Sequence, residues 1–577
     1  MDVLYDPILG ELRSDVEAGA GLEKNGDVIS LASASSAYVY GVMRDQPITN
    51  VAATSYRVVL NKDHDVPGDA LRYTKVDAFA ALPAHNLRRC TVLPANIPTR
   101  TVNYYLNPSD SNLKADGSAA KLDGTDGDVL VHFPLYYWRL DLYTDENSKL
   151  WYVYLVSNIQ FNGSAIKRFF YTGPGGATAR DQFVGAFHSV VCDSEGAIIE
   201  QTDANTPVAY GATRRLRSIA GARPNGNSTR AECRTMHANN AGVTVAAGTC
   251  TNTNSMFGEA LLLLMMIEFN SLDIQAVFSA GFTNMAAWNY SSMRNTGRTA
   301  SLGNQSGEIE AVDAASGDPD YDIATLWNAT ALADHSKRIV ACSYRGIENP
   351  FGAYWENQDG IQKNQDNTEL DITVNGVVYD RDIENDYASG DTHYYAWTKA
   401  GTGTIYTEVP HPAIGAATYT YDSDTDTFTS TGYTETAFDE DFSQSGYWCT
   451  NDTTLYSRLD SQIAPVAENG RFPDVGYTGN ALVWVHHPWP KASGYVLNFD
   501  PESFFPTKLG GSANTGLCDY FYNDTNAGAR LVYRGGALHN GSNAGVGYVN
   551  VNNDLGNRNA NIGSRLGTKL NKVFRRA

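Results

Sequence analysis

The chain of 577 residues is too long for one ordinary hydrophobic core, so we expect about two to four domains. Its 52 glycines, 34 tyrosines and 9 tryptophans, against only 19% charged residues, favour a β-rich, loop-rich protein and argue against a helical bundle. A formal net charge of −21 disfavours binding to nucleic acid, because neutralising phosphates needs clustered Lys and Arg.

The first hundred residues, 1–100, are expected to form a β-rich domain. The stretches 37–43 and 55–61 read as short strands between turns, and the second alternates apolar with polar residues. The N-terminal stretch 1–13 has no basic segment followed by an apolar run, so we expect no signal peptide.

Residues 101–165 are expected to form an aromatic hairpin module. A Gly/Asp-rich loop over 117–127 leads into two aromatic-rich stretches, 129–143 and 150–157, which a short polar loop separates. Two such strands joined by a short loop predict a β-hairpin whose aromatic side chains fill a packing layer.

The remaining residues, 166–577, are expected to form one large domain. Helical segments are predicted around 214–219 and over 254–270, with Asn254 and Ser255 as possible caps. The apolar run 261–267 is closed by Glu268 and is too short to span a bilayer, so we expect a buried helix and no membrane insertion.

An acidic insertion rich in Thr, Tyr and Gly is expected over 366–442, built of strands and turns. Asp422, Asp424 and Asp426 alternate as in a calcium loop, but the Gly and terminal Glu of an EF-hand are missing. A solvated acidic turn is favoured there, and occasional Ca²⁺ binding stays open.

The seven cysteines are scattered and odd in number, without zinc-site spacing. We expect mostly buried free thiols, which fits assembly in a reducing cytoplasm. The adjacent His486 and His487 have no further metal ligand beside them, and a rigid aromatic turn is favoured there. The sequence contains no recognisable catalytic motif, so we expect no enzyme and no cofactor, although paired carboxylates for glycan hydrolysis stay open.

Three stretches are more specific than these patterns. The first is 123–137, where DGTDGDVLVHFP leads into an aromatic strand, and the second is 344–360, with Arg345, Gly346, Glu348, Asn349 and Trp355. Both resemble segments of the fibre and minor structural proteins of tailed phages. The third begins at Arg534, Gly535 and Gly536 and ends at Ile562, Gly563 and Arg565. It is similar to the C-terminal signature of C-type-lectin-like domains in formylglycine-generating-enzyme-type proteins, which phage variable proteins diversified by retroelements share.

The resemblance spans about 100–577 and implies an α+β fold: a β-rich N-terminal part, followed by a large, loop-rich C-type-lectin-like domain. At two places the sequence departs from the family pattern, which argues against assigning the family's residue roles to this chain position by position. Ala537 and Leu538 occupy the place where the family usually has an aromatic residue, and only Cys449 and Cys518 are available where the oxidases hold copper.

Ligand contacts are expected in the segment between the two parts of the third motif. Its polar and aromatic side chains suit adaptable recognition, whereas the alternative is a loop whose side chains satisfy its own backbone. The candidate ligand-binding residues are His539, Asn540, Ser542, Asn543, Tyr548, Asn550, Asn552, Asn553 and Asn557.

The resemblance implies a fibre protein on the virion surface, assembled in the host cytoplasm as a homotrimer with other virion proteins. The N-terminal domain would attach to the virion, and the lectin-like domain would bind a glycan or protein of the host-cell surface. A capsid-decorating or head-fibre component without receptor specificity is the alternative, and a glycan-degrading enzyme is a third. A basic C-terminal stretch favours a solvated tail or a tail that docks on an acidic partner; its cations are Arg558, Arg565, Lys569, Lys572, Arg575 and Arg576.

Overall fold

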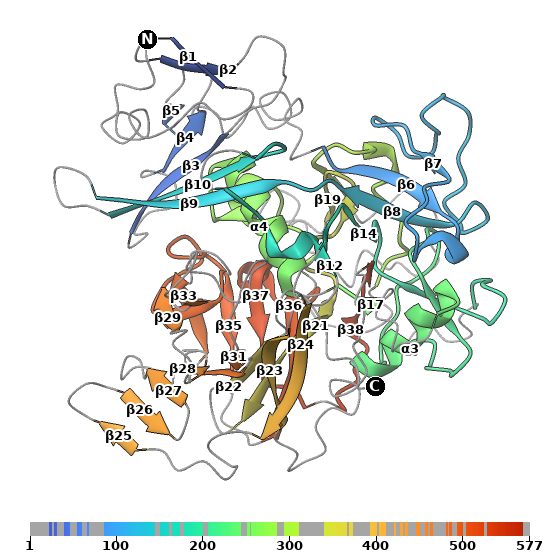
Figure 1. Cartoon of the computed structure of the whole chain (residues 1–577). Coiled ribbons are helices and arrows are strands. Elements are labelled where there is room, and N and C mark those ends of the chain that lie inside the picture. Colours follow the sequence, from blue (N-terminus) through green and yellow to red (C-terminus); the bar gives the residue numbers. More distant parts are fainter. Residues whose placement is uncertain are drawn as a thin grey trace.

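The computed structural model describes three long stretches of the chain, 86–310, 340–372 and 493–568, and isolated strands between 22 and 67 and between 393 and 486. The gaps within the long stretches are 145–149, 161–163, 173–177, 200–205, 244–250, 254, 285–292, 366–368, 500–503, 524–527 and 555. Within the described residues the fold is mixed, with many strands in several sheets and few helices (Figure 1).

One sheet joins the N-terminal strands to the predicted aromatic hairpin. Its order is β11 (Ala165–Ile166), β9 (Tyr137–Thr144), β10 (Leu150–Ser157), β3 (Tyr40–Gln46), β4 (Ser55–Val59) and β5 (Val66–Pro67). The predicted strands at 37–43 and 55–61 are therefore confirmed as β3 and β4. The predicted hairpin is confirmed as β9 and β10, but its first strand begins at Tyr137 rather than at 129, because residues 128–133 form a separate strand of another sheet. A further pair near the N-terminus is β1 (Leu22–Asn25) with β2 (Val28–Leu31).

The residues that precede the hairpin form β8 (Asp128–Phe133), which belongs to a second sheet. The order there is β17 (Thr251–Asn252), β39 (Leu566–Gly567), β14 (Gln182–Gly185), β8, β6 (Arg88–Val92) and β7 (Tyr104–Tyr105). Strands from both sides of the boundaries expected near 100 and 165 thus share sheets, and the division into three domains stays a prediction.

The third large sheet carries the C-terminal part of the chain. From one edge its order is β25 (Thr420–Asp422), β26 (Thr427–Ser430), β27 (Tyr433–Thr436), β28 (Gly446–Thr450), β32 (Trp484–His486) and β22 (Glu369–Ile372). It continues with β21 (Trp355–Gln365), β36 (Gly528–Gly535), β37 (Gly545–Asn550), β35 (Tyr520–Tyr522), β33 (Gly494–Phe499) and β34 (Pro506–Leu509), while β38 (Ile562–Gly563) pairs with β21.

Smaller sheets complete the described strands. They are β12 (Tyr171–Thr172) with β13 (Thr178–Ala179), β15 (Val190–Cys192) with β16 (Arg215–Arg217), β18 (Gly307–Glu310) with β19 (Val340–Tyr344) and β20 (Ile347–Glu348), β24 (Gly403–Pro410) with β23 (His393–Ala400) and β31 (Ala481–Leu482), and β29 (Tyr456–Leu459) with β30 (Gln462–Pro465). The strands predicted in the acidic insertion are confirmed where it is described; Asp424, Asp426 and His487 lie outside the described residues.

The predicted apolar helix is confirmed as α4 (Ser255–Phe269). Every side chain from Ala260 to Ile267 is at most 1% exposed, as expected for a helix that is apolar on all sides. In Figure 1 the helix lies between the hairpin β9–β10 and the strands β36 and β37 of the third sheet, and it contacts β3, β21 and β37. This layer forms the main core. No helix among the described residues is long and apolar enough to cross a membrane.

The other α-helices in the described residues are α3 (Arg230–Ala241) and the single turn α5 (Ile274–Val277). A capping box starts α3, because the Thr229 hydroxyl accepts from the backbone N–H of Glu232 and the Glu232 carboxylate accepts from that of Thr229. Gly242 ends the helix in a left-handed conformation with φ of 67°.

The helix predicted around 214–219 is wrong, because these residues form the strand β16. Arg215–Arg217 pair with β15 in antiparallel register. Leu216 is fully buried, and the Arg217 guanidinium forms an ion pair with the buried Asp128 carboxylate. Pairing with a remote strand thus outweighs a local pattern in which Leu216 and Ile219 share a helical spacing.

Candidate ligand-binding surface

The three sequence motifs meet around the buried side chain of Arg565. Its Nε donates to Glu356 Oε1 at 2.6 Å, and its Nη2 donates to the carbonyls of Glu348 and Asn349 at 2.8 and 3.1 Å. Its Nη1 donates to the carbonyl of Gly185 at 3.0 Å, on the strand β14 that pairs with β8 of the first motif. The most distinctive charged residue of the third motif therefore holds the fold together.

Arg565 lowers the pKa of the neighbouring Glu356 carboxyl group and of the His188 imidazole. Burial raises the pKa of Glu356, but Arg565 and His188 outweigh burial and lower that pKa to about 2. Burial, assisted by the positive charge of Arg565, lowers the pKa of His188. Glu356 is thus an anion and His188 a neutral imidazole near pH 7.

The second motif is structural as well. Arg345 donates from Nε and Nη2 to the two carboxylate oxygens of Glu268, at 2.8 and 2.9 Å, and Glu268 is fully buried on α4. Glu348 accepts from the backbone N–H groups of Gly297 and Thr299 at 2.9 and 2.8 Å. Bidentate pairing of this kind fixes both partners.

A glycine turn leads from the core to the predicted ligand-binding segment. Gly535 and Gly536 have φ of 90° and 79°, where a side chain would be strained. A Cβ on Gly536 would lie 2.9 Å from the Cβ of Ala544. Trp355 pairs with Ile562 in parallel register, so both ends of the third motif are joined to the second. Of the residues expected to be structural, Gly535 and Ile562 contact the second motif, Arg565 contacts Glu348 and Asn349, and Arg345 pairs instead with Glu268 on α4.

The first half of the predicted segment reaches the surface. Ser542 is exposed, and His539, Asn540 and Asn543 are partly exposed. The turn is held by backbone groups, because Asn540 Oδ1 accepts from Ala537 N at 2.6 Å and Gly541 N donates to Thr283 O at 2.9 Å.

In the second half of the segment, the asparagine side chains form hydrogen bonds within the segment itself. Asn550 Oδ1 accepts from Asn552 N and from Asn553 Nδ2, and Asn557 donates to Asn553. These amides satisfy one another, as the loop alternative in the sequence analysis expects. Asn550 is 7% exposed, and Tyr548 is 2% exposed with its ring against Trp355, so neither is presented at the surface.

Three tyrosines that the sequence analysis did not single out lie on β33 and β35, and one of them contacts the exposed turn. Tyr495 on β33 and Tyr520 on β35 are register partners, and Tyr522 follows on β35. The Tyr495 hydroxyl lies 3.0 Å from the Ser542 hydroxyl. The alternation Tyr-Phe-Tyr over 520–522 was the available signal, since it places both tyrosines on one face of a strand.

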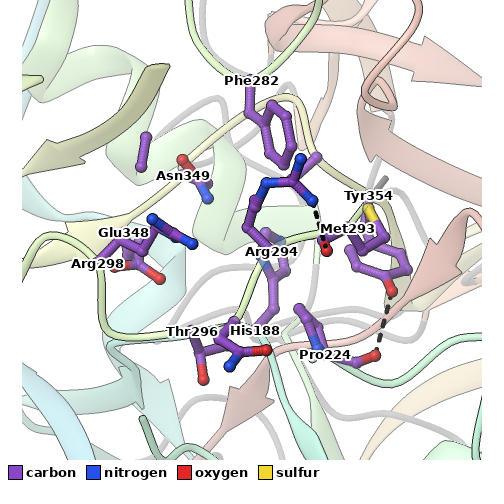
Figure 2. Close-up of a pocket in the computed structure, with 13 residues that line it drawn as sticks. His188, Pro224, Phe282, Met293, Arg294, Thr296, Arg298, Glu348, Asn349 and Tyr354 are labelled. Carbon is purple, nitrogen blue, oxygen red and sulfur yellow. Dashed lines mark hydrogen bonds between the residues drawn. The ribbon is translucent and has the colours of Figure 1, made fainter. Parts of the chain in front are cut away.

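A separate hollow lies beside the Arg565 network (Figure 2). His188, Glu348, Arg298 and Tyr354 line it, and in Figure 2 the side chain of Arg294 runs between them. Its free volume of about 10 Å³ holds about one water molecule. We therefore assign no organic ligand to this hollow.

Metal binding finds no support within the described part of the chain, which contains no group of three or more His, Cys, Asp or Glu side chains suited to an ion. Comparison of the sequence with known protein families found no match, and comparison with curated proteins found none either.

Proposed function

We propose that this chain is a virion surface protein of a tailed phage that attaches the particle to a host-cell surface receptor. Its C-terminal part would be a C-type-lectin-like domain. The observation that carries the proposal is the exposed turn around Ser542, which stands on a framework of buried arginines and positive-φ glycines.

Rigidity of that turn supports a binding role. Its backbone is tied to Thr283, Gln275 and Ala537, so little conformational freedom is left to lose when a ligand binds. Asn and Ser side chains beside tyrosines offer hydrogen bonds and flat apolar area in one patch.

Display in several copies would add to the affinity of one site. By analogy with the phage fibres that the sequence motifs resemble, we propose a homotrimer assembled with other virion proteins; linked sites in such a trimer raise avidity without any new contact. A modest affinity at each turn is then sufficient for attachment.

Binding of the labelled full-length protein to a panel of bacteria, measured by flow cytometry, tests the proposal. We expect saturable binding to some strains and a loss of about tenfold or more in affinity for Ser542→Arg, because the added side chain covers the patch. Ser194→Arg is the matched control, since Ser194 is also exposed and lies on the turn after β15. Binding of the folded protein to no strain, or equal binding by both variants, would reject the proposal.

A further inference from the structure

We infer that the ligand of this surface is a neutral carbohydrate, and that Tyr495, Tyr520 and Tyr522 hold it beside Ser542. The inference rests on the proposed function, because it names the chemical class of the receptor. It adds residues that lie outside the segment between the two parts of the third motif.

The first two tyrosines form a right-angled corner. Their ring centroids lie 5.2 Å apart and their planes cross at 84°. Tyr495 and Tyr520 are both partly exposed, and Tyr522 is 40% exposed. Because residues two apart on a strand share a face, Tyr522 extends the same side of β35.

Two buried aromatic rings pack behind this pair of tyrosines. Tyr520 meets the buried Tyr548 edge-on, with centroids 5.9 Å apart, and Tyr548 meets Trp355 at 4.5 Å. Burial raises the pKa of Tyr548, and the phenols of Tyr520, Tyr522 and Tyr495 raise it further. Tyr495 and Tyr520 are therefore held by these contacts before any ligand arrives, which lowers the entropy lost on binding.

The segment that forms the exposed turn and β37 carries no formal charge, which favours a neutral ligand. From His539 to Asn553 the chain has no Asp, Glu, Lys or Arg, although its net charge is −21. Burial lowers the pKa of His539, so its imidazole is neutral near pH 7. An acidic polysaccharide would be expected to meet Arg or Lys, which bind carboxylate and phosphate oxygens.

The groups present match the two sides of a sugar ring. A pyranose has an apolar C–H face, which packs on an aromatic ring, and a rim of hydroxyls, which both donate and accept hydrogen bonds. The Tyr495 and Ser542 hydroxyls lie 3.0 Å apart, and each can donate and accept. Asn540 and Asn543 are partly exposed in the same turn.

An array of neutral and acidic bacterial oligosaccharides tests the inference with the full-length protein. We expect binding to neutral members, and a loss of about tenfold or more for Tyr495→Ser and for Tyr522→Ser. Tyr522→Phe should retain most of the affinity, because it keeps the ring. Leu93→Ser is the matched control, since Leu93 is 42% exposed and lies outside the patch. An unchanged melting temperature for each variant separates lost contact from lost folding.

Treated cells distinguish failure of this inference from failure of the proposed function. Periodate cleaves the vicinal diols of sugars, so it should abolish binding to strains that wild-type protein recognises, whereas protease treatment should leave binding intact. The opposite pattern, or array binding confined to acidic sugars, would overturn the carbohydrate inference and leave receptor binding standing. Absence of binding to any untreated strain would remove the proposed function itself.

Discussion

Arg565 donates from Nε to Glu356 Oε1 at 2.6 Å across 209 positions of the sequence. The same guanidinium reaches carbonyls of two further segments, that of Gly185 and that of Glu348 and Asn349. A single buried side chain thus joins the second and third sheets.

Replacement of Arg565 by Met is expected to lower the free energy of unfolding by about 3–5 kcal/mol, because it leaves Glu356 and several carbonyls buried without their donor. Urea unfolding followed by tryptophan fluorescence measures the change. Arg558→Met is the control, since Arg558 is 52% exposed in its ion pair with Glu232 and should contribute less than about 1 kcal/mol. Equal effects of the two variants would contradict the central role of Arg565.

Gly545→Ala is expected to destabilise the protein by about 3 kcal/mol or more, because β37 makes room for a buried carboxylate. An added Cβ would lie 1.7 Å from Asp519 Oδ1, and Asp519 Oδ2 accepts from Gly547 N at 2.7 Å. Gly307→Ala is the control, because its Cβ would meet only Leu302, at 3.6 Å, and its effect should stay within about 1 kcal/mol. Thermal unfolding of both variants measures the difference, and a tolerated Gly545→Ala would argue against this packing.

Local elements were predictable from the sequence because their signals are local. The apolar run of α4 and the aromatic strands β9 and β10 carry their own periodicity, and both are observed. The strand β16 was not predictable in this way, since its conformation depends on pairing with β15.

The candidate surface was predictable only in part. The exposed turn at Ser542 follows from the polar composition of the segment, but the burial of Tyr548 does not. β37 lies between β36 and β35, so both its edges are paired and Tyr548 is covered by Trp355 and Tyr520. The contact of Tyr495 with Tyr520 depends on strand register, which no short stretch of sequence encodes.

His237 is expected to make the fold sensitive to acid. Burial lowers the pKa of His237 from the ordinary 6.5 to about 3. Between these pH values His237 is therefore protonated in the unfolded chain and neutral in the folded chain. The contribution of this group to stability is complete above pH 6.5 and decreases by up to about 1.4 kcal/mol per unit as the pH falls from 6.5 to about 3. Unfolding of wild type and His237→Gln at pH 7 and pH 5 measures it. The wild type should lose more stability between these values than the variant, and parallel losses would exclude His237 as the source.

The described cysteines are expected to be inert in the folded protein. Cys90, Cys192, Cys233, Cys342 and Cys518 are buried free thiols, which confirms the prediction for these five. Burial raises the pKa of Cys192 and of Cys233 to about 12, so almost no reactive thiolate is present at pH 8. Iodoacetamide labelling, read out by peptide mass spectrometry, should leave these five cysteines unmodified in buffer. It should modify all of them in about 6 M guanidinium chloride, which unfolds even very stable domains. Rapid labelling of Cys192 or Cys233 without denaturant would show that the strand β15 or the helix α3 opens locally, and would contradict their placement in the core.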